Sequence, residues 1–485
     1  MKKLLTILLG IALILPLYSQ EYDDDDYDDD YDYEYDDETG YETTAGEEAA
    51  PIEIAPKEAA PKEAAPKEAP HPVREKKPPK EEPAPEPEKK NHLARQYFEI
   101  GIDAGVGFDN GLVGLNDILK KNIEIDLKKI AQSIPENGSG LNFDLATDFF
   151  MNIKNIHIGK GLWDFGFIVD VDGGINMNIP KSLFTLISDG NINPPHASSG
   201  TISASGSIFT EIGLKSSSKY RVGRRNLYVG IKPAIFTPVV YIPSHTGISY
   251  SLKTEKEEDN GTTKEGLFLD TEGAISVYTP TSLERINFGR LIFGANGFDL
   301  SLGAEYAFSP YLDIGGNLSN IPIAAAVLTN EMRLRLEDKD TGDDFGFELS
   351  GTVKAPNLGF TPDYIYNVKK EVRRPMRFDL YAHYRPFKSD FLEIKPNLGF
   401  TVNINKEDEK WYFNGGLEAR LSLINFLIIY LGSGYKEEIW RQRVGFAVNL
   451  RVFELGLEAM LRDQTFDGCF KGRGFGFNLG LRFGW

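Results

Sequence analysis

From Tyr97 onward, apolar and polar side chains alternate along segments of ten or more residues. In the first segment, residues 97–108, every even position is apolar and the odd positions are mostly polar or glycine. Residues 298–308 and 411–421 repeat the pattern. Successive side chains of a β-strand point to opposite faces, and a tilted membrane-spanning strand needs about nine to eleven residues, against about five or six in soluble sheets. The lengths therefore favour strands that span a membrane.

The last segment, residues 475–485, carries the most specific pattern in the chain. Glycine and polar residues occupy one face of this strand, and an aromatic residue, Trp485, stands at its end. It resembles the C-terminal strand of bacterial outer-membrane barrels, and the resemblance implies recognition by the barrel-assembly machinery. The apolar face that forms this predicted assembly signal consists of Phe475, Phe477, Leu479, Leu481, Phe483 and Trp485.

Short turn signals at 309–310, 386–390 and 406–409 would join neighbouring strands as hairpins. We therefore predict an all-β fold, a transmembrane antiparallel up-and-down β-barrel over residues 93–485. It has about 14–18 strands, with sixteen as the best single count, because the segments 247–254, 329–337 and 282–293 are ambiguous. A soluble sandwich also alternates, but it leaves the terminal strand and the long alternating faces unexplained.

Two segments with helical spacing interrupt the strand pattern early in the barrel. Between Asn116 and Ile134, apolar residues recur at intervals of three and four positions, which is the spacing of one helix face. A second, shorter helix is predicted between Pro180 and Gly190. Two interpretations remain open for these helices. They form a hatch or lid over the lumen, or they are loop helices packed on the rim.

The chain begins like an exported protein. Lys2 and Lys3 precede an apolar run from Leu4 to Leu17, and a plausible cleavage site follows at Ser19. We interpret residues 1–19 as a signal peptide, because the apolar run is too short for a spanning helix. The single cysteine, Cys469, excludes an intrachain disulfide.

The segment before the barrel is predicted to be a disordered N-terminal arm in two parts. Residues 20–50 form an acidic tail rich in Tyr and Asp, and residues 51–92 form a spacer of Pro, Lys and Glu with APKEA repeats. Like-charge repulsion and frequent proline prevent folding. The tail lacks the spaced ligands of an EF-hand loop. A cell-wall or periplasmic partner of residues 20–90 and a spacer without a partner are both open interpretations.

The net charge of −19 belongs mainly to this arm, since residues 91–485 carry only about −5. The absence of a basic patch argues against nucleic-acid binding. The six histidines are scattered, and the sequence contains no nucleophile elbow, P-loop or dinucleotide fingerprint. We therefore expect no catalytic residues, no metal ligands, no cofactor and no enzymatic activity.

Charged residues also occur within the alternating segments, on the face opposite the apolar one. Because a charge on the lipid face is costly, we predict that these side chains face the lumen. Two interpretations are open: a pore whose acidic excess favours cations, or a network of paired charges that fills the barrel and conducts nothing. The predicted lumen-facing charges are Glu99, Asp103, Glu211, Asp299, Glu305, Asp379, His383, Arg385, Glu418, Arg420, Glu454, Glu458, Arg462 and Arg482.

Several segments in a fixed order carry a family resemblance: IPKSLFTLISDGN, then FTEIGLKSS and NLYVGIKPAIF, then GFDLSLGAEYAFSPYLDIGGNLSNIPI. Together with the strands around them, over about residues 95–485, they resemble an uncharacterised family of predicted outer-membrane barrels of diderm bacteria. More remotely, the chain resembles long-chain fatty-acid transporter barrels, which carry hydrophobic molecules past a hatch. It departs from them because a polar spacer stands where their hatch lies.

The leading hypothesis is an outer-membrane, porin-like channel or transporter for small solutes, hydrophobic ones included. Its partners are then outer-membrane lipid and the barrel-assembly machinery, and its arm lies in the periplasm. The alternative is a plugged structural or adhesive surface barrel that the arm tethers to the cell wall.

Overall fold

The structure is a computed structural model of the chain, and β-strands account for most of it. It describes residues 97–111, 132, 134, 138–159, 161–189, 198–259, 262–283, 287–338, 345–348, 358–387, 391–424 and 426–485. The arm and most of the predicted helix 116–134 lie outside these residues.

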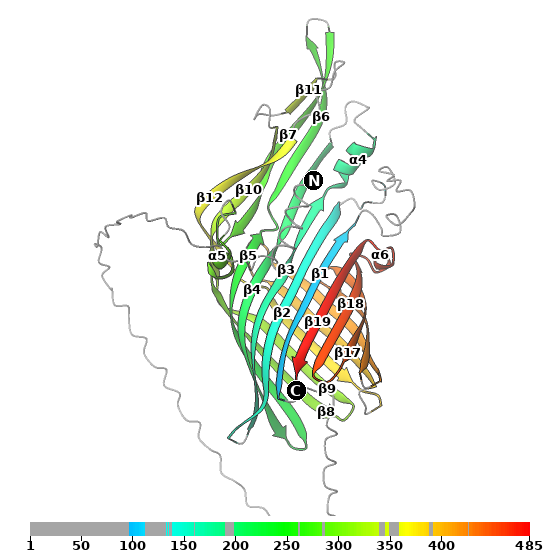
Figure 1. Cartoon of the computed structure of the whole chain (residues 1–485). Helices are drawn as coiled ribbons and strands as arrows, with labels where there is room; N and C mark the ends of the chain where they lie inside the picture. The colour runs from blue at the N-terminus through cyan, green and yellow to red at the C-terminus, as the bar shows by residue number, and fades with distance from the viewer. Residues whose placement is uncertain are drawn as a thin grey trace, which may run out of the picture. The chain divides into compact units, whose positions relative to one another are not determined.

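Fourteen of the described strands form a closed antiparallel ring (Figure 1). The ring follows the chain order except that β5 pairs with β8 and β9 pairs with β13. It closes where β19 pairs with β1. In ring order the strands are β1 (Phe98–Asn110), β2 (Ser139–Ile158), β3 (Gly161–Ile179), β4 (Ser198–Val222), β5 (Arg225–Ile242), β8 (Gly297–Ser309), β9 (Leu312–Ala324), β13 (Met376–Tyr384), β14 (Leu392–Asn403), β15 (Lys410–Ile424), β16 (Leu427–Lys436), β17 (Ile439–Asn449), β18 (Phe453–Asp463) and β19 (Gly474–Gly484).

The other five described strands extend the sheet beyond the ring, and we call them the extension. The first part of β4 pairs with β6, β6 with β7, and β7 with both β10 and β11, while β12 pairs with β10. Figure 1 shows these strands rising past one end of the ring. Their bounds are β6 (Gly247–Asp259), β7 (Thr262–Thr279), β10 (Ala326–Asp338), β11 (Phe345–Glu348) and β12 (Leu358–Val372).

The two faces of the ring strands differ as the alternation predicts. Large apolar side chains are exposed on the outer face of the ring, with 57% of Phe477, 58% of Leu398 and 62% of Leu214 accessible. On β19 the exposed apolar residues alternate with Gly474, Gly476, Asn478, Gly480 and Arg482. An outward apolar face of this kind is what a barrel presents to lipid.

The two ends of the ring have connections of different length. At the end that holds Tyr97 and Trp485, which we call the closing end, the connections span two to seven residues. At the other end, the far end, five of the seven connections span ten or more residues, and two of these contain the extension. The predicted turns at 309–310 and 386–390 lie at the closing end, and the turn at 406–409 lies at the far end.

Three short helices among the described residues belong to far-end connections. They are α4 (Lys181–Asp189), α5 (Phe288–Phe293) and α6 (Phe466–Phe470). α4 confirms the second predicted helix. In α5 the side chain of Asn287 accepts a hydrogen bond from the Arg290 amide and so caps the helix. Among the described residues, no helix has both the length and the apolar character needed to cross a membrane.

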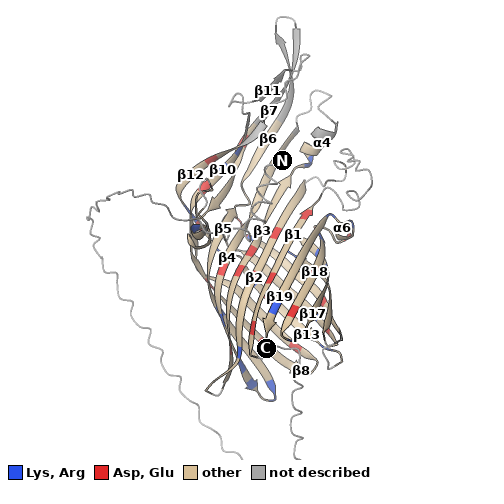
Figure 2. Ribbon diagram, in the orientation of Figure 1, with Lys and Arg blue, Asp and Glu red and all other residues tan. Residues whose placement is uncertain are grey.

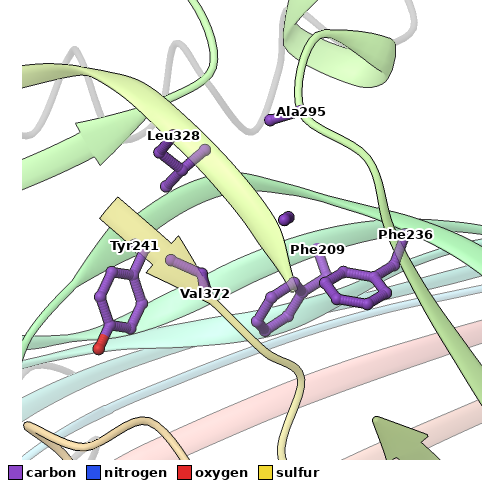
Figure 3. Packing of buried hydrophobic residues seen from close by; sticks show 7 residues of the cluster. Phe209, Phe236, Tyr241, Ala295, Leu328 and Val372 are labelled. Carbon is purple, nitrogen blue, oxygen red and sulfur yellow. The ribbon is translucent and has the colours of Figure 1, made fainter. Parts of the chain in front are cut away.

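Two apolar clusters hold the extension onto the ring. The first joins Phe209 of β4 and Phe236 of β5 to Leu328 and Val372 of the extension (Figure 3). The rings of Phe209 and Phe236 meet edge to face, with centroids 5.9 Å apart. The second cluster packs Ile248 and Val277 of the extension against β4 and β5. Burial of these side chains fixes where the extension leaves the ring.

The predicted fold class, an antiparallel transmembrane β-barrel with 14–18 strands, is confirmed. The best single count of sixteen lies between the fourteen ring strands and the nineteen strands of the whole described sheet. The ambiguous segments 247–254 and 329–337 are strands of the extension, and 282–293 contains α5. Apolar and polar residues alternate along the extension strands as they do along the ring strands. The sequence pattern alone therefore cannot distinguish the two kinds of strand.

Closure of the ring generates the first prediction. The Tyr97 amide donates to the Trp485 carbonyl at 3.0 Å, and the Trp485 amide donates to the Phe98 carbonyl at 3.1 Å. Deleting residues 483–485 removes these bonds and should abolish the heat-modifiable gel migration of a folded barrel, because unpaired backbone is costly in lipid. Deleting residues 20–90 should leave that migration intact. An arm-deleted protein that fails to fold would contradict this division.

Cys469 provides a direct test of packing around α6. The side chain is fully buried, and its thiol donates to the Trp440 carbonyl at 3.4 Å. Burial and the nearby Asp463 carboxylate raise the pKa of the Cys469 thiol to about 11. Because the thiolate is the reactive form, the folded protein at pH 8 should react with iodoacetamide far more slowly than the urea-denatured protein. Equal reaction rates of the folded and the denatured protein, measured by mass spectrometry, would show that α6 does not pack around Cys469.

Candidate solute pathway in the barrel lumen

Two cavities lie between the walls of the ring. The central cavity, of about 730 Å³, is lined by residues of β1, β2, β9 and β13–β19, and the rim cavity measures about 770 Å³. The rim cavity reaches the far-end turns at Glu407 and Glu437. Asp144, Arg377 and Arg441 line both cavities. The cavities therefore meet, one after the other, along the lumen.

Two ion pairs cross the lumen where the cavities meet, and we call them the charge bridge. Arg377 Nη1 of β13 lies 3.0 Å from Asp172 Oδ2 of β3, and Arg441 Nη2 of β17 lies 3.0 Å from Asp144 Oδ2 of β2. These strands are not neighbours in the ring, since at least three strands separate the members of each pair. Arg377 also approaches Glu437 Oε1 at 3.6 Å. The charge bridge thus joins non-adjacent parts of the wall across the lumen.

Closely spaced glycines form part of the wall beside the charge bridge. Gly173 of β3 and Gly206 of β4 have positive φ angles of 152° and 144°, and both line the rim cavity. A Cβ on Gly173 would lie 2.0 Å from the Ser207 carbonyl oxygen. Only glycine allows the two backbones to approach in this way, so the wall here is bare backbone.

Arg374, in the connection from β12 to β13, occupies a buried site between ring strands. Its guanidinium donates to Glu211 of β4 and lies 3.3 Å from Asp299 of β8. It also stands 6.0 Å from the ring centroids of Phe209 and Phe236. Lys232 of β5 forms a second ion pair with Glu211. The site balances two carboxylates with two cations and anchors the extension to the ring.

Arg462 of β18 forms a second buried centre. The side chain is fully buried, with Nε 3.0 Å from Asp109 and Nη1 2.7 Å from Asp144. Gly107 lies on β1, which β19 separates from β18, and it has no room for a Cβ because Arg462 Nη1 occupies that position. The arginine therefore fills a space that a glycine leaves open, and it holds Asp144 in the charge bridge.

Nearer the closing end, ion pairs continue from strand to strand around the inner wall. Arg385 of β13 reaches Asp313 of β9 at 2.7 Å and Glu393 of β14 at 3.0 Å. Arg443 of β17 reaches Glu418 of β15 at 3.3 Å. The other pairs of this belt are His383–Glu393 at 3.0 Å, Lys395–Glu393 at 3.4 Å, Arg482–Asp103 at 3.2 Å and Arg482–Glu454 at 3.7 Å.

The structure brings part of the predicted lumen-facing set together. Asp103, Asp379, His383, Glu418, Glu458 and Arg462 line the central cavity. Glu211 and Asp299 meet at Arg374, while Glu305 lies 3.9 Å from His383. Glu99 pairs with Lys154, Arg420 lies 4.0 Å from Glu393, and Arg385, Glu454 and Arg482 belong to the belt. Within the described part of the chain, Asp379 alone in this set has no ion pair within 4.0 Å.

Sequence reasoning missed several charges that line the cavities. These residues alternate as the predicted ones do, so the strand pattern of 139–158 and 439–449 could have revealed Asp144, Asp148, Arg441 and Arg443. With them included, the central cavity is lined by six carboxylates and six Lys or Arg side chains, and it lacks the acidic excess expected of a cation pore. The missed residues include Asp144, Asp148, Asp172, Arg377, Lys395, Lys436, Arg441 and Arg443.

The chemistry of the lining is that of charge and hydrogen bonding. Over the described residues, no group of three or more His, Cys, Asp and Glu side chains is arranged to hold a metal ion. Figure 2 shows the charged positions spread along the ring strands, with acidic positions on the neighbouring strands β1 to β4. The fold and the lumen define a transmembrane β-barrel with a charged interior.

Part of the chain matches a known protein family. Residues 91–322 match the model of a family described as "Family of unknown function (DUF5723)". This match confirms the resemblance to an uncharacterised family. No curated protein matches the chain in sequence.

The fold is remotely similar to several solved barrels. The Pseudomonas putida toluene transporter TodX has 7% sequence identity and a TM-score of 0.39, with 81% of this chain and 91% of that chain covered. The Ralstonia pickettii toluene transporter TbuX has 10% identity and a TM-score of 0.38 over 81% and 91%. A Pseudomonas aeruginosa FadL homologue has 7% identity and a TM-score of 0.34 over 80% and 90%. At this distance, the function has to be argued from the residues of this chain.

The buried arginine generates a stability prediction. Replacing Arg374 with Met leaves Glu211 and Asp299 buried without their shared cation, which typically costs about 3–5 kcal/mol. We expect the free energy of unfolding to fall by about that amount, measured from urea-dependent loss of heat-modifiable migration. The matched control is Arg373→Met, because 43% of the Arg373 side chain is exposed. It should change stability by less than about 0.5 kcal/mol. Equal effects of the two variants would refute the role of Arg374.

Proposed function

We propose that this protein is an outer-membrane channel through which small polar solutes pass along the lumen of the barrel. The observation that carries the proposal is the pair of cavities that meet at the charge bridge. Together they extend from the far-end turns toward the belt of ion pairs. A lumen packed solid with side chains would leave no such space.

The chemistry of the lining supports polar solutes over hydrophobic ones. Most side chains that line the central cavity are charged or carry amides, and Val106, Ala146, Pro396 and Met460 are its main apolar members. An apolar solute would have to displace water from these charges without replacing its hydrogen bonds. A polar solute exchanges hydrogen bonds with the wall as it moves.

Three features support the location and orientation. The apolar outer face suits a bilayer, the first nineteen residues have the pattern of a signal peptide, and the closing end has the short turns. Outer-membrane barrels have short periplasmic turns and longer extracellular loops. In this orientation the arm begins in the periplasm, and the extension projects from the cell surface.

The charge bridge is then the constriction of the channel. Its members come from strands that are not adjacent in the ring, so each pair must separate or be bypassed when a solute moves from one cavity to the other. Ion pairs in a wet lumen are weak enough to open, because water screens them. The bridge would set the size of the solute that passes.

A second candidate is the plugged structural barrel. The observation that favours it is the dense pairing of the interior, since thirteen of the fourteen predicted lumen-facing charges have an ion pair within 4.0 Å. In that case the extension is a display surface and the lumen conducts nothing.

Single-channel conductance separates the two candidates. The mature protein in planar bilayers should show discrete steps, and Arg377→Gln should give larger steps because the bridge from β13 to β3 is lost. Neutralising one cation should also shift the reversal potential toward cation selectivity. The matched control is Arg373→Gln, since Arg373 lines neither cavity. A folded wild-type barrel that stays silent, with Arg377→Gln equally silent, would favour the plugged barrel.

A further inference from the structure

We propose that the central cavity selects zwitterionic solutes, such as free amino acids, by holding their ammonium and carboxylate groups against opposite walls. This inference rests on the proposed channel function and names its substrate class. It is carried by the unequal distribution of charge between the two sides of one cavity.

One side of the cavity is acidic. The lining residues that come from β1 and β2 include Asp103, Asp144 and Asp148, and they include no Lys or Arg. The register places four carboxylates directly opposite one another on adjacent strands: Asp103 with Asp148, Asp148 with Asp170, and Asp170 with Glu211. Like charges in directly opposed positions destabilise a sheet. Within this row Asp103 and Glu211 have cations of their own, at Arg482 and Arg374, and Asp103 and Asp148 are the members that line the central cavity.

The side of the cavity formed by β13–β18 is basic. β13–β18 contribute six cations to the lining, and the three carboxylates from the same strands are Asp379, Glu418 and Glu458. Arg443 lies 3.3 Å from Glu418 and 3.9 Å from Glu458, and Lys395 lies 3.9 Å from Glu418. The cations on this side are Arg377, Lys395, Lys436, Arg441, Arg443 and Arg462.

Three charged groups that line the central cavity have no oppositely charged partner within 4.0 Å among the described residues: Lys436, Asp148 and Asp379. Among the described residues, the Lys436 ammonium has no carboxylate within 4.0 Å, and it lines both cavities beside Arg377 and Arg441. Asp148 likewise has no cation within 4.0 Å in this part of the chain. The other charges of the bridge are engaged with one another. Asp379 lies on the side that carries the cations, so Asp148 and Lys436 are the unpaired groups of opposite sign on the two sides of the cavity.

A zwitterion fits this arrangement better than other small solutes. Its ammonium is attracted to the acidic side while its carboxylate is attracted to the basic side, so both ends gain Coulomb energy at once. A simple anion or cation is repelled by one side, and a neutral solute gains from neither. A volume of about 730 Å³ is within the range of cavities that hold small molecules.

The test compares two isomers of identical size, glycine and glycolamide, of which only glycine is a zwitterion. Liposomes that contain the full mature protein are diluted into each solute, and the swelling rate is measured. We expect glycine to enter faster than glycolamide through the wild-type protein. Asp148→Asn and Lys436→Gln should each reduce this preference, and the double variant should abolish it. The matched controls are Glu371→Gln and Lys471→Gln, which lie outside both cavities and should retain the wild-type preference.

The outcomes separate this inference from the channel itself. Equal rates for glycine and glycolamide through the wild-type protein would overturn the zwitterion preference, while the channel would stand. A wild-type preference that survives in folded Asp148→Asn and Lys436→Gln proteins would overturn the assignment to these residues. No swelling with either solute would overturn the proposed function, and this inference with it. The wild-type comparison remains decisive even if a variant fails to fold.

Discussion

The rest of the structure depends on one constraint: a backbone inside a bilayer must find all its hydrogen-bond partners within the protein. Closure of the ring between β19 and β1 meets this constraint, with eleven residue pairs in register from Glu99 to Asp109. Once the ring is closed, each strand has one face toward lipid and one toward the lumen. Every charged side chain of a spanning strand must then share the lumen with the others.

That confinement explains why the interior is both paired and hollow. Charges from nearby strands pair along the wall, as Arg443 of β17 does with Glu418 of β15, and charges from strands farther apart in the ring pair across the lumen, as Arg377 does with Asp172. Pairing satisfies the charges without filling the space, because glycine occupies many inward positions on β16 and β19. The remaining space and the unequal sides of the central cavity are what the proposed passage of polar solutes uses.

The sequence was sufficient to predict the barrel, the two faces of β1, β8, β15 and β19, and the helix α4. Alternation reports which face a residue occupies, and so it identified Asp103 and Glu418 as inward candidates. It cannot report which strands close the ring, because extension strands such as β10 alternate in the same way. It also cannot show that Arg377 meets Asp172, since that pair is separated by 205 positions and depends on closure. Lys436 stands at a strand end next to a turn, where alternation no longer assigns a face.

The central claim is that solutes pass the charge bridge inside the lumen. The most direct measurement is single-channel recording of Arg377→Cys in a Cys469→Ser background while a bulky methanethiosulfonate reagent is added. The account predicts a stepwise fall in current as the thiol is modified, and no change for Phe378→Cys, whose native side chain is exposed on the outer face. Unchanged current through Arg377→Cys, with modification verified by mass spectrometry, would contradict the account.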